Sequence, residues 1–231
     1  MKRDPKGDVN SRHRRDEHRR WHFEYNPVSL DDIKPFQIIG TRERSMISAI
    51  IVAASISDGH PAWLSHCGQV MADGRTVSEA VFPTHAYTPI EAFLHKYSTR
   101  NSRLTIMQLR EGIYQTEEIR IKAQRECQLY HESLDSMQYQ VSGLLPMLLT
   151  SILRNSNPFL KRGAWKAIPQ EKEKEIYICS GEIDYGWSWL QRKINHDIFP
   201  STLSLKIPSP QDVYNSDDTQ YVAGTRKVYD R

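Results

Sequence analysis

The chain has 231 residues, of which 39% are hydrophobic and 10% aromatic, and this is enough to bury one sizeable core. No apolar run reaches the roughly 20 residues of a membrane-spanning helix, and no apolar stretch follows the charged N-terminus as it would in a secretory signal. Three scattered cysteines are too few for a disulfide framework or a zinc site, so we expect a reducing compartment.

The formal net charge of +3 is unevenly distributed along the chain. The first 20 residues carry eight Lys or Arg against four acidic residues, an excess of four, so the other 211 residues sum to −1. We therefore predict a basic flexible arm over residues 1–26 and a folded domain over residues 27–231. Trp21, Phe23 and Tyr25 alternate with polar residues, which also suits an edge strand that docks on the domain.

Two elements open the domain, a short strand over residues 35–39 and a buried helix over 45–56. Two strands then surround the dipeptide Asp73-Gly74, which is a strong hairpin signal. The sequence Thr88-Pro89-Ile90-Glu91 is a capping box with proline at the first helical position, so we expect a helix that runs to about residue 97. The later elements are a strand over 104–109, helices over 116–130, 141–153 and 180–194, a helix that begins at Ser209-Pro210, and a closing strand over 220–223.

The hairpin places a histidine close to a carboxylate. With Asp73-Gly74 as the turn, Gly68 faces Glu79 on the opposite strand. His66 and Glu79 then lie on the same face as diagonal neighbours, about 7–8 Å apart at the backbone, a gap that the two side chains can close. Gly68 leaves the carboxylate room to lean toward the imidazole. A carboxylate in this position can orient a catalytic histidine.

Cys179 ends an apolar run and precedes a predicted helix. A free thiol has a pKa of about 8.5, which the amides of a helix N-terminus and a nearby imidazolium can lower by several units. We therefore expect Cys179 to be a nucleophile and His66 to be the base that takes and returns its proton. Glu79 would fix the imidazole ring and stabilise its charge.

Each of these residues also has a purely structural interpretation. A lone cysteine in apolar surroundings is more often a small buried hydrophobe, a lone histidine is more often structural, and Glu79 alone would be an exposed hairpin residue. Cys67 has the opposite strand parity to His66, and Cys127 lies within a predicted helix, so both are assigned to packing. The sequence offers no partner for three further histidines, His60, His85 and His131.

Four short motifs resemble those of the circularly permuted NlpC-type thiol peptidases. The string Ser65-His66-Cys67-Gly68-Gln69-Val70, followed by Val77-Ser78-Glu79-Ala80, resembles the histidine hairpin of that family. Ile178-Cys179-Ser180 looks like its nucleophile site, and Ser209-Pro210-Gln211-Asp212-Val213 looks like the helix that follows. The order His, Glu, Cys is what permutation of a papain-like core would give. This branch includes the YiiX-like proteins and, more distantly, lecithin:retinol acyltransferase.

The resemblance implies an α+β, circularly permuted papain-like fold in which a small antiparallel sheet packs against helices. It implies a thiol hydrolase or acyltransferase in which Cys179, His66 and Glu79 form a catalytic triad. The substrate would be an amide or ester in a peptide, a cell-wall peptide or a lipid amide. No metal and no organic cofactor are implied, since this chemistry uses side chains only.

Two other classes of protein fit the same sequence. One is a non-enzymatic structural or virion-associated protein that keeps a hydrolase-like fold and uses the basic arm, residues 2–20, to bind an assembly partner. The other is a nucleic-acid-binding module, in which the arm holds the polyanion, because clustered Arg and Lys are typical of such proteins. The expected location is cytoplasmic or virion-associated.

Overall fold

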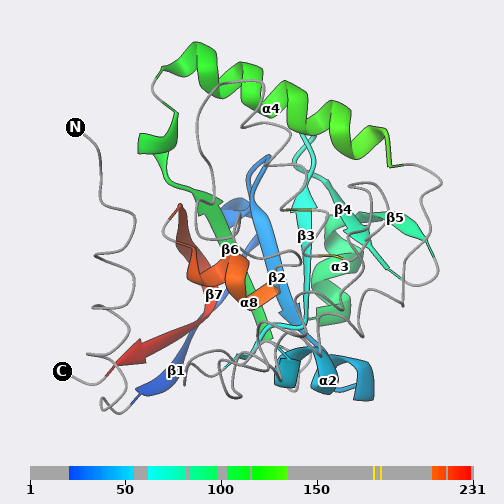
Figure 1. Ribbon diagram of the computed structural model, residues 1–231, viewed down its shortest axis with the longest axis vertical. Helices are drawn as coiled ribbons and strands as arrows, with labels where there is room; N and C mark the ends of the chain where they lie inside the picture. The colour runs from blue at the N-terminus through cyan, green and yellow to red at the C-terminus, as the bar shows by residue number, and fades with distance from the viewer. Residues whose placement is uncertain are drawn as a thin grey trace, which may run out of the picture.

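A computed structural model describes residues 21–54, 62–81, 84–97, 103–114, 116–134, 179, 183, 210–216 and 218–229 (Figure 1). At its centre is a seven-stranded sheet in the order β1-β7-β6-β2-β3-β4-β5, and each pair of neighbouring strands is antiparallel. Helices pack against both faces of this sheet. The α+β class expected from the sequence is therefore confirmed.

The described elements follow the predicted order with one additional strand, β5, which contains the Thr88 and Pro89 that were expected to open the following helix. The strands are β1 (Trp21–Asn26), β2 (Ile38–Arg42), β3 (His66–Val70), β4 (Thr76–Ala80), β5 (His85–Pro89), β6 (Arg103–Leu109) and β7 (Thr219–Tyr229). The helices are α2 (Met46–Ala54), α3 (Ile90–Tyr97), α4 (Glu117–Glu132) and α8 (Pro210–Asn215), with short 3₁₀ turns η1 (Leu30–Asp32) and η2 (Glu111–Ile113).

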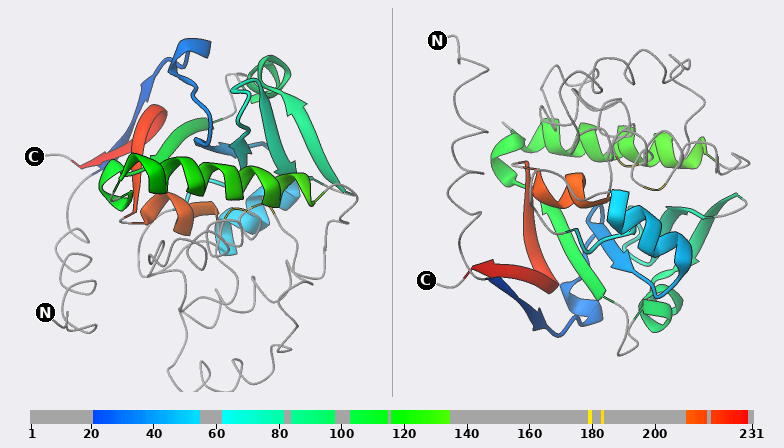
Figure 2. Two further views of the ribbon diagram at one scale, coloured as in Figure 1. Left: turned by 90° about the horizontal axis from the view of Figure 1, so that it is seen from above. Right: turned by 60° about the horizontal axis from the view of Figure 1, so that its bottom comes forward.

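Alternation along the strands sends side chains into two separate cores. Ile38 belongs to the cluster that contains residues of α4 and α8, whereas its neighbour Ile39 belongs to the cluster that contains residues of α3. Both side chains are fully buried. Figure 2 shows α3 on the opposite side of the sheet from α4 and α8. Because both faces are covered, β2 and β6 carry buried apolar side chains on both sides.

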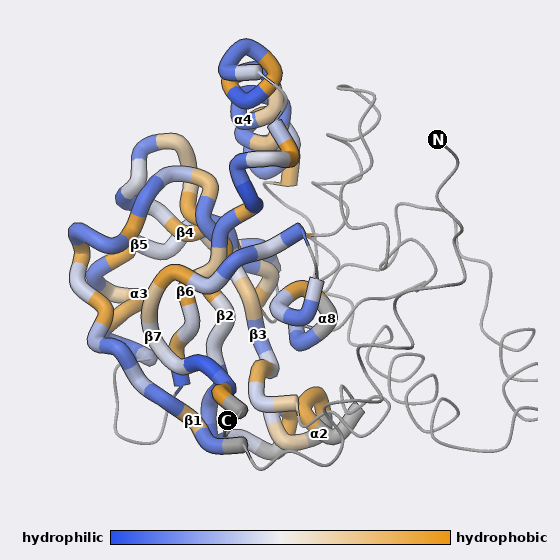
Figure 3. The backbone as a smooth tube through the Cα atoms, turned by 90° about the vertical axis from the view of Figure 1, so that its left-hand side faces the viewer, coloured by the Kyte–Doolittle hydropathy of each residue, from blue (hydrophilic) through white to orange (hydrophobic). Residues whose placement is uncertain are grey.

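α4 is a mainly hydrophilic helix that buries one narrow stripe (Figure 3). Ala123, Cys127 and His131 recur every four residues and are all buried, which is the spacing of one helix face. The helix begins after Thr116, whose hydroxyl accepts a hydrogen bond from the amide of Ile119 (3.2 Å). The helix predicted over residues 116–130 is confirmed.

The first strand of the domain lies three residues later than the sequence predicts, because β2 begins at Ile38 rather than at Pro35. Pro35 and Phe36 instead form a turn, in which Phe36 has a φ of 66°. Bulky residues rarely adopt this left-handed conformation. The amide of Phe36 donates to the carbonyl of Val70 (2.9 Å), so a tertiary contact holds the turn in place.

The β3–β4 hairpin has the predicted register. Gly74 has a φ of 65°, as the turn requires, and the carboxylate of Asp73 accepts hydrogen bonds from two amides that follow it, at 2.9 and 3.0 Å. The paired positions are Gln69–Ser78 and Val70–Val77. This is the register in which Gly68 and Glu79 come opposite one another.

The N-terminal and C-terminal strands of the sheet are neighbours. β1 pairs along its whole length with β7, so the edge strand expected for Trp21, Phe23 and Tyr25 is confirmed. The guanidinium of Arg226 lies 2.7 Å from the carboxylate of Glu24 across this pair. The last six residues of the predicted arm are thus part of the sheet.

Several predicted elements lie outside the described residues. These are the arm up to residue 20, the helix over 141–153, and most of the helix over 180–194, of which only Ile183 is described. Ile183 is helical, and so is Cys179. None of the helices in the described part of the chain is long and apolar enough to cross a membrane.

Candidate active site

His66 and Glu79 meet across the β3–β4 hairpin. Nε2 of His66 lies 2.8 Å from Oε2 of Glu79, and their side chains are 16% and 3% exposed. Gly68 makes this contact sterically possible, because a Cβ at that position would lie 2.7 Å from Cγ1 of Val77 and 3.3 Å from Cβ of Glu79. The structure therefore brings together the histidine and the carboxylate that the register predicts as diagonal neighbours.

The second oxygen of the Glu79 carboxylate also has a donor. The hydroxyl of Thr88, on β5, donates to Oε1 of Glu79 at 2.6 Å. Burial raises the pKa of Glu79, but the hydrogen bond and charge of His66 and the hydrogen bond from Thr88 outweigh it and lower the pKa below its ordinary value. Thr88 lies in β5 and not at the cap of a helix as expected from the sequence, which does not predict this contact. The pairing of β4 with β5 sets Thr88 opposite Val77 and so brings its hydroxyl within reach of Glu79, and no local sequence pattern predicts this pairing.

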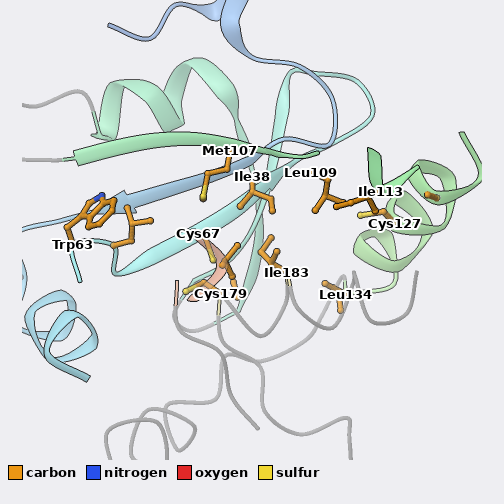
Figure 4. Packing of buried hydrophobic residues seen from close by; sticks show 14 residues of the cluster. Ile38, Trp63, Cys67, Met107, Leu109, Ile113, Cys127, Leu134, Cys179 and Ile183 are labelled. Atoms are coloured by element: carbon orange, nitrogen blue, oxygen red, sulfur yellow. The ribbon is translucent and has the colours of Figure 1, made fainter. Parts of the chain in front are cut away.

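Cys179 joins this group from a distant part of the sequence. It is 3% exposed and helical, whereas the sequence analysis placed it just before a helix. Its thiol forms hydrogen bonds with the side chain of His66 and with both the thiol and the backbone amide of Cys67. Figure 4 shows Cys67 and Cys179 beside one another, with Cys127 away from them on α4. All three residues predicted for the site are therefore in one hydrogen-bonded group.

The charges of Cys179 and His66 stabilise each other. The hydrogen bond from the Cys67 side chain and the charge of His66 hold the pKa of the Cys179 thiol well below its ordinary value, although burial opposes them. Burial lowers the pKa of His66, but the charge of Cys179 and the hydrogen bonds with Cys179 and Glu79 raise it well above its ordinary value. Both shifts run in the direction that favours a thiolate on Cys179 and an imidazolium on His66.

Cys179 contacts residues that point to opposite faces of the sheet. Alternation places Cys67 on the face toward α4 and His66 on the face toward α3. The ladder between β3 and β4, however, consists of two pairs and stops at Gln69. Cys179 can therefore contact Cys67 and also reach His66 at the end of β3. Cys67 packs in the buried core, as the sequence predicts, and its side chain also has a hydrogen bond with Cys179, which the sequence did not predict.

Tyr97 of α3 lies against the imidazole. The ring centroids of Tyr97 and His66 are 6.4 Å apart and their planes are inclined by 23°. Tyr97 is itself 3% exposed, and the ammonium of Lys96 lies 4.8 Å from the centre of its ring. The stacked ring and the Glu79 carboxylate together restrict the orientation of the imidazole.

A second polar network lies beneath α4, on the other face of the hairpin. The hydroxyl oxygen of Ser78 is 2.7 Å from Nδ1 of His131 and 2.8 Å from Nε2 of His85. Nε2 of His131 is in turn 3.0 Å from Oε1 of Gln69. This network ties α4 to the strands that carry His66 and Glu79. It accounts for His85 and His131, for which the sequence offers no partner, while His60 lies outside the described residues.

The comparisons with known proteins find distant similarity to solved structures. No protein-family model and no curated protein matches the chain. A solved structure that does match is the crystal structure of metalloprotein YiiX from Escherichia coli O157:H7, a DUF1105 protein. The similarity covers 83% of this chain and 97% of that chain, at 19% identity and a TM-score of 0.42. Values this low leave the function of this chain to be argued from its own residues.

Potential metal ligands are not grouped in the part of the chain that the structure describes. Among those residues, no set of three or more His, Cys, Asp or Glu side chains is arranged to hold a metal ion.

Proposed function

We propose that the chain is a cysteine hydrolase or acyltransferase of the circularly permuted papain-like kind, which acts on an amide or ester bond. The observation that carries the proposal is the continuous hydrogen-bonded chain from Cys179 through His66 and Glu79 to Thr88. A cysteine that serves only in packing is a neutral thiol, whereas the pKa of Cys179 is held down by its neighbours. A buried thiolate beside an imidazolium fits covalent catalysis better than packing.

In the proposed mechanism, each nitrogen of the His66 ring has its own role. Nε2 is held by Glu79, so Nδ1 is the nitrogen that serves Cys179. The Cys179 sulfur attacks the carbonyl carbon of the substrate, and a tetrahedral intermediate forms. The His66 imidazolium then gives its proton to the leaving amine or alcohol, and the acyl group stays on Cys179 as a thioester.

The second half of the reaction regenerates the thiolate. His66 takes a proton from water, or from another acceptor, as that group attacks the thioester. The acyl group leaves as a carboxylic acid in a hydrolase, or on the acceptor in an acyltransferase. Glu79 stays ionised and stabilises the imidazolium that forms in each cycle. A peptide, a cell-wall peptide or a lipid amide supplies the carbonyl group that this chemistry needs, and the steps require no cofactor.

Acyl transfer to Cys179 is testable by mass spectrometry. Mixing the protein with an activated small ester, p-nitrophenyl acetate, should add one acetyl group to Cys179 and release p-nitrophenol. Cys179→Ser should abolish both effects and leave the fold intact, because the change is nearly isosteric and the hydroxyl has a far higher pKa. Cys127→Ser is the matched control and should keep both. Retained turnover in Cys179→Ser would place the nucleophile elsewhere.

The basic arm favours a second role for the chain. Its excess of four positive charges suits an acidic assembly partner or a nucleic acid. A structural or virion-associated protein with this role alone needs no activated thiol, so its Cys179 should react with an alkylating agent no faster than its Cys127. An enzyme that also has this arm should show a fast Cys179 and salt-sensitive binding together.

A further inference from the structure

Two of the three cysteines in this chain lie in contact. Cys67 projects from β3 into the same cluster as Cys179, and the two thiols are hydrogen-bonded. Figure 4 shows their side chains beside one another, while Cys127 lies on α4 near Ile113. All three cysteines are free thiols in this structure. A disulfide places its two sulfurs about 2 Å apart, and side chains that already lie beside one another can reach this separation by rotation and a small backbone shift.

We propose that Cys67 and Cys179 form a reversible, peroxide-induced disulfide that switches the active site off. Cys67 then has a role that packing does not require, as the resolving thiol for the nucleophile. The proposal rests on the proposed function in one respect, namely that Cys179 is a reactive thiolate. Its oxidant is hydrogen peroxide or another hydroperoxide.

The oxidation proceeds in two balanced steps. The Cys179 thiolate attacks one oxygen of hydrogen peroxide, the O–O bond breaks, and the departing hydroxide takes the proton of the His66 imidazolium to become water. Cys179 is now a sulfenic acid. The Cys67 sulfur then attacks the Cys179 sulfur, the S–O bond breaks, and the hydroxide leaves as water with the proton of the Cys67 thiol. The thiols lose two electrons and the peroxide gains them.

The position of Cys67 also decides what happens to the sulfenic acid. A sulfenic acid without a nearby thiol is oxidised further to sulfinic and sulfonic acids, which a thiol reductant does not reverse. Cys67 already contacts the Cys179 sulfur, so ring closure needs no large rearrangement and precedes the second oxidation. Cys67 therefore protects Cys179 from irreversible oxidation and also inactivates it reversibly.

The test is a non-reducing peptide map of the full chain after treatment with hydrogen peroxide. The result expected is a linked peptide that joins Cys67 to Cys179, with the loss of two hydrogens per chain and with Cys127 still open to alkylation. Dithiothreitol should remove the link and restore both thiols. Sulfinic acid on Cys179 without the linked peptide, a link to Cys127, or no reaction of Cys179 would each overturn the proposal.

Variants separate the resolving role from simple exposure to oxidant. In Cys67→Ala, the same treatment should convert Cys179 to forms that carry two or three added oxygens and that dithiothreitol does not reverse. Cys127→Ser is the matched control and should form the link as the unaltered chain does. If Cys67→Ala does not fold, the peptide map of the unaltered chain still decides the matter.

The mass measurement needs no substrate, so it fails independently of the proposed function. Turnover without a Cys67–Cys179 link would overturn only the disulfide. A link without turnover of any substrate would support the disulfide and contradict the proposed hydrolase function.

Discussion

The Glu79 carboxylate is held by one donor on each of its oxygens, His66 at 2.8 Å and Thr88 at 2.6 Å. These two contacts differ in what they do for the reaction. The contact with His66 stabilises the imidazolium. The contact with Thr88 fixes the position of the carboxylate and lowers its pKa. Single substitutions of Glu79 and of Thr88 can separate the two effects.

Glu79→Gln should lower kcat by about ten- to a hundredfold. A neutral amide can still hold the ring but no longer stabilises its positive charge, a difference of about 1.5–3 kcal/mol for a hydrogen bond to a charged group. The pKa of His66 should fall, because the Glu79 contact helps to raise it. NMR titration of the imidazole and steady-state kinetics measure both effects. Full activity in Glu79→Ala would show that another residue orients His66.

Thr88→Val should shift the acidic limb of the pH profile of kcat to higher pH. The hydroxyl helps to lower the pKa of Glu79, so its loss raises that pKa, and the carboxylate is then protonated sooner as the pH falls. Removal of this bond should cost on the order of 1 kcal/mol, or about fivefold in kcat, near the acidic limb. Thr88→Ser keeps the hydroxyl and should restore the original profile. An unchanged profile in Thr88→Val would mean that Thr88 only packs.

At the scale of elements, the short helix α8 fixes the chain just before β3. Oε1 of Gln211 accepts hydrogen bonds from the amides of Trp63 (2.9 Å) and Leu64 (3.4 Å), and its side-chain amide donates to Asn215 (3.1 Å). Gln211 and Trp63 are each 1% exposed, so the Gln211 side chain satisfies a buried backbone amide. His66 follows two residues later. We infer that α8 is a support for the histidine strand.

Gln211→Met should destabilise the fold by about 1–3 kcal/mol, because it leaves a buried amide without an acceptor. The same variant should slow the alkylation of Cys179, since His66 would be held less firmly. Gln128→Met is the matched control: Gln128 also accepts an amide hydrogen bond, from Ala72 at 3.0 Å, but at an exposed position. Its cost should stay within about 0.5 kcal/mol. Equal costs in urea unfolding would argue against a supporting role for α8.

The sequence predicts those elements whose signals are local. Asp73 and Gly74 specify the hairpin and its register, and with them the contact of His66 with Glu79. Thr116 and Pro210 mark the starts of α4 and α8 for similar reasons, since a cap or a proline acts within one turn.

The remaining features depend on contacts between distant parts of the chain. The turn at Phe36 is held by Val70, and the Thr88 hydroxyl is directed to Glu79 by strand pairing that no local pattern shows. The contact of Cys67 with Cys179 depends on where β3 and β4 stop pairing. Periodicity describes the interior of an element well, and it fails at these ends, where the candidate site lies.

At the scale of the whole molecule, the arm and the candidate site attach to different parts of the sheet. The arm leads into β1 at one edge, and His66 lies on β3 with β7, β6 and β2 between them. At about 4.8 Å per strand, this separation is roughly 19 Å, about two Debye lengths at physiological salt.

The arm should bind polyanions in a salt-dependent manner that turnover does not share. Between roughly 50 and 200 mM salt, a few phosphate contacts should lose about ten- to a hundredfold in affinity, because counterions are released on binding. Deletion of residues 2–20 should abolish this binding and leave turnover of a small ester unchanged. The deletion should stop before Trp21, because β1 is part of the sheet. Loss of turnover on deletion would show that the arm belongs to the catalytic fold.

The central claim, a thiolate–imidazolium pair of Cys179 and His66, is tested most directly by the rate of alkylation of Cys179 with iodoacetamide as a function of pH. The lowered pKa of Cys179 keeps the thiolate as the pH falls below the ordinary thiol value of about 8.5. The raised pKa of His66 keeps the imidazolium as the pH rises above about 6.5. Peptide mapping should show a rate for Cys179 that stays level from about pH 8.5 to 6.5, a range in which the rate for an ordinary thiol falls about tenfold per pH unit. In His66→Ala, the rate for Cys179 should regain the steep fall. A rate for Cys179 that falls about tenfold per pH unit in the unaltered chain, as for an ordinary thiol, would contradict the pair.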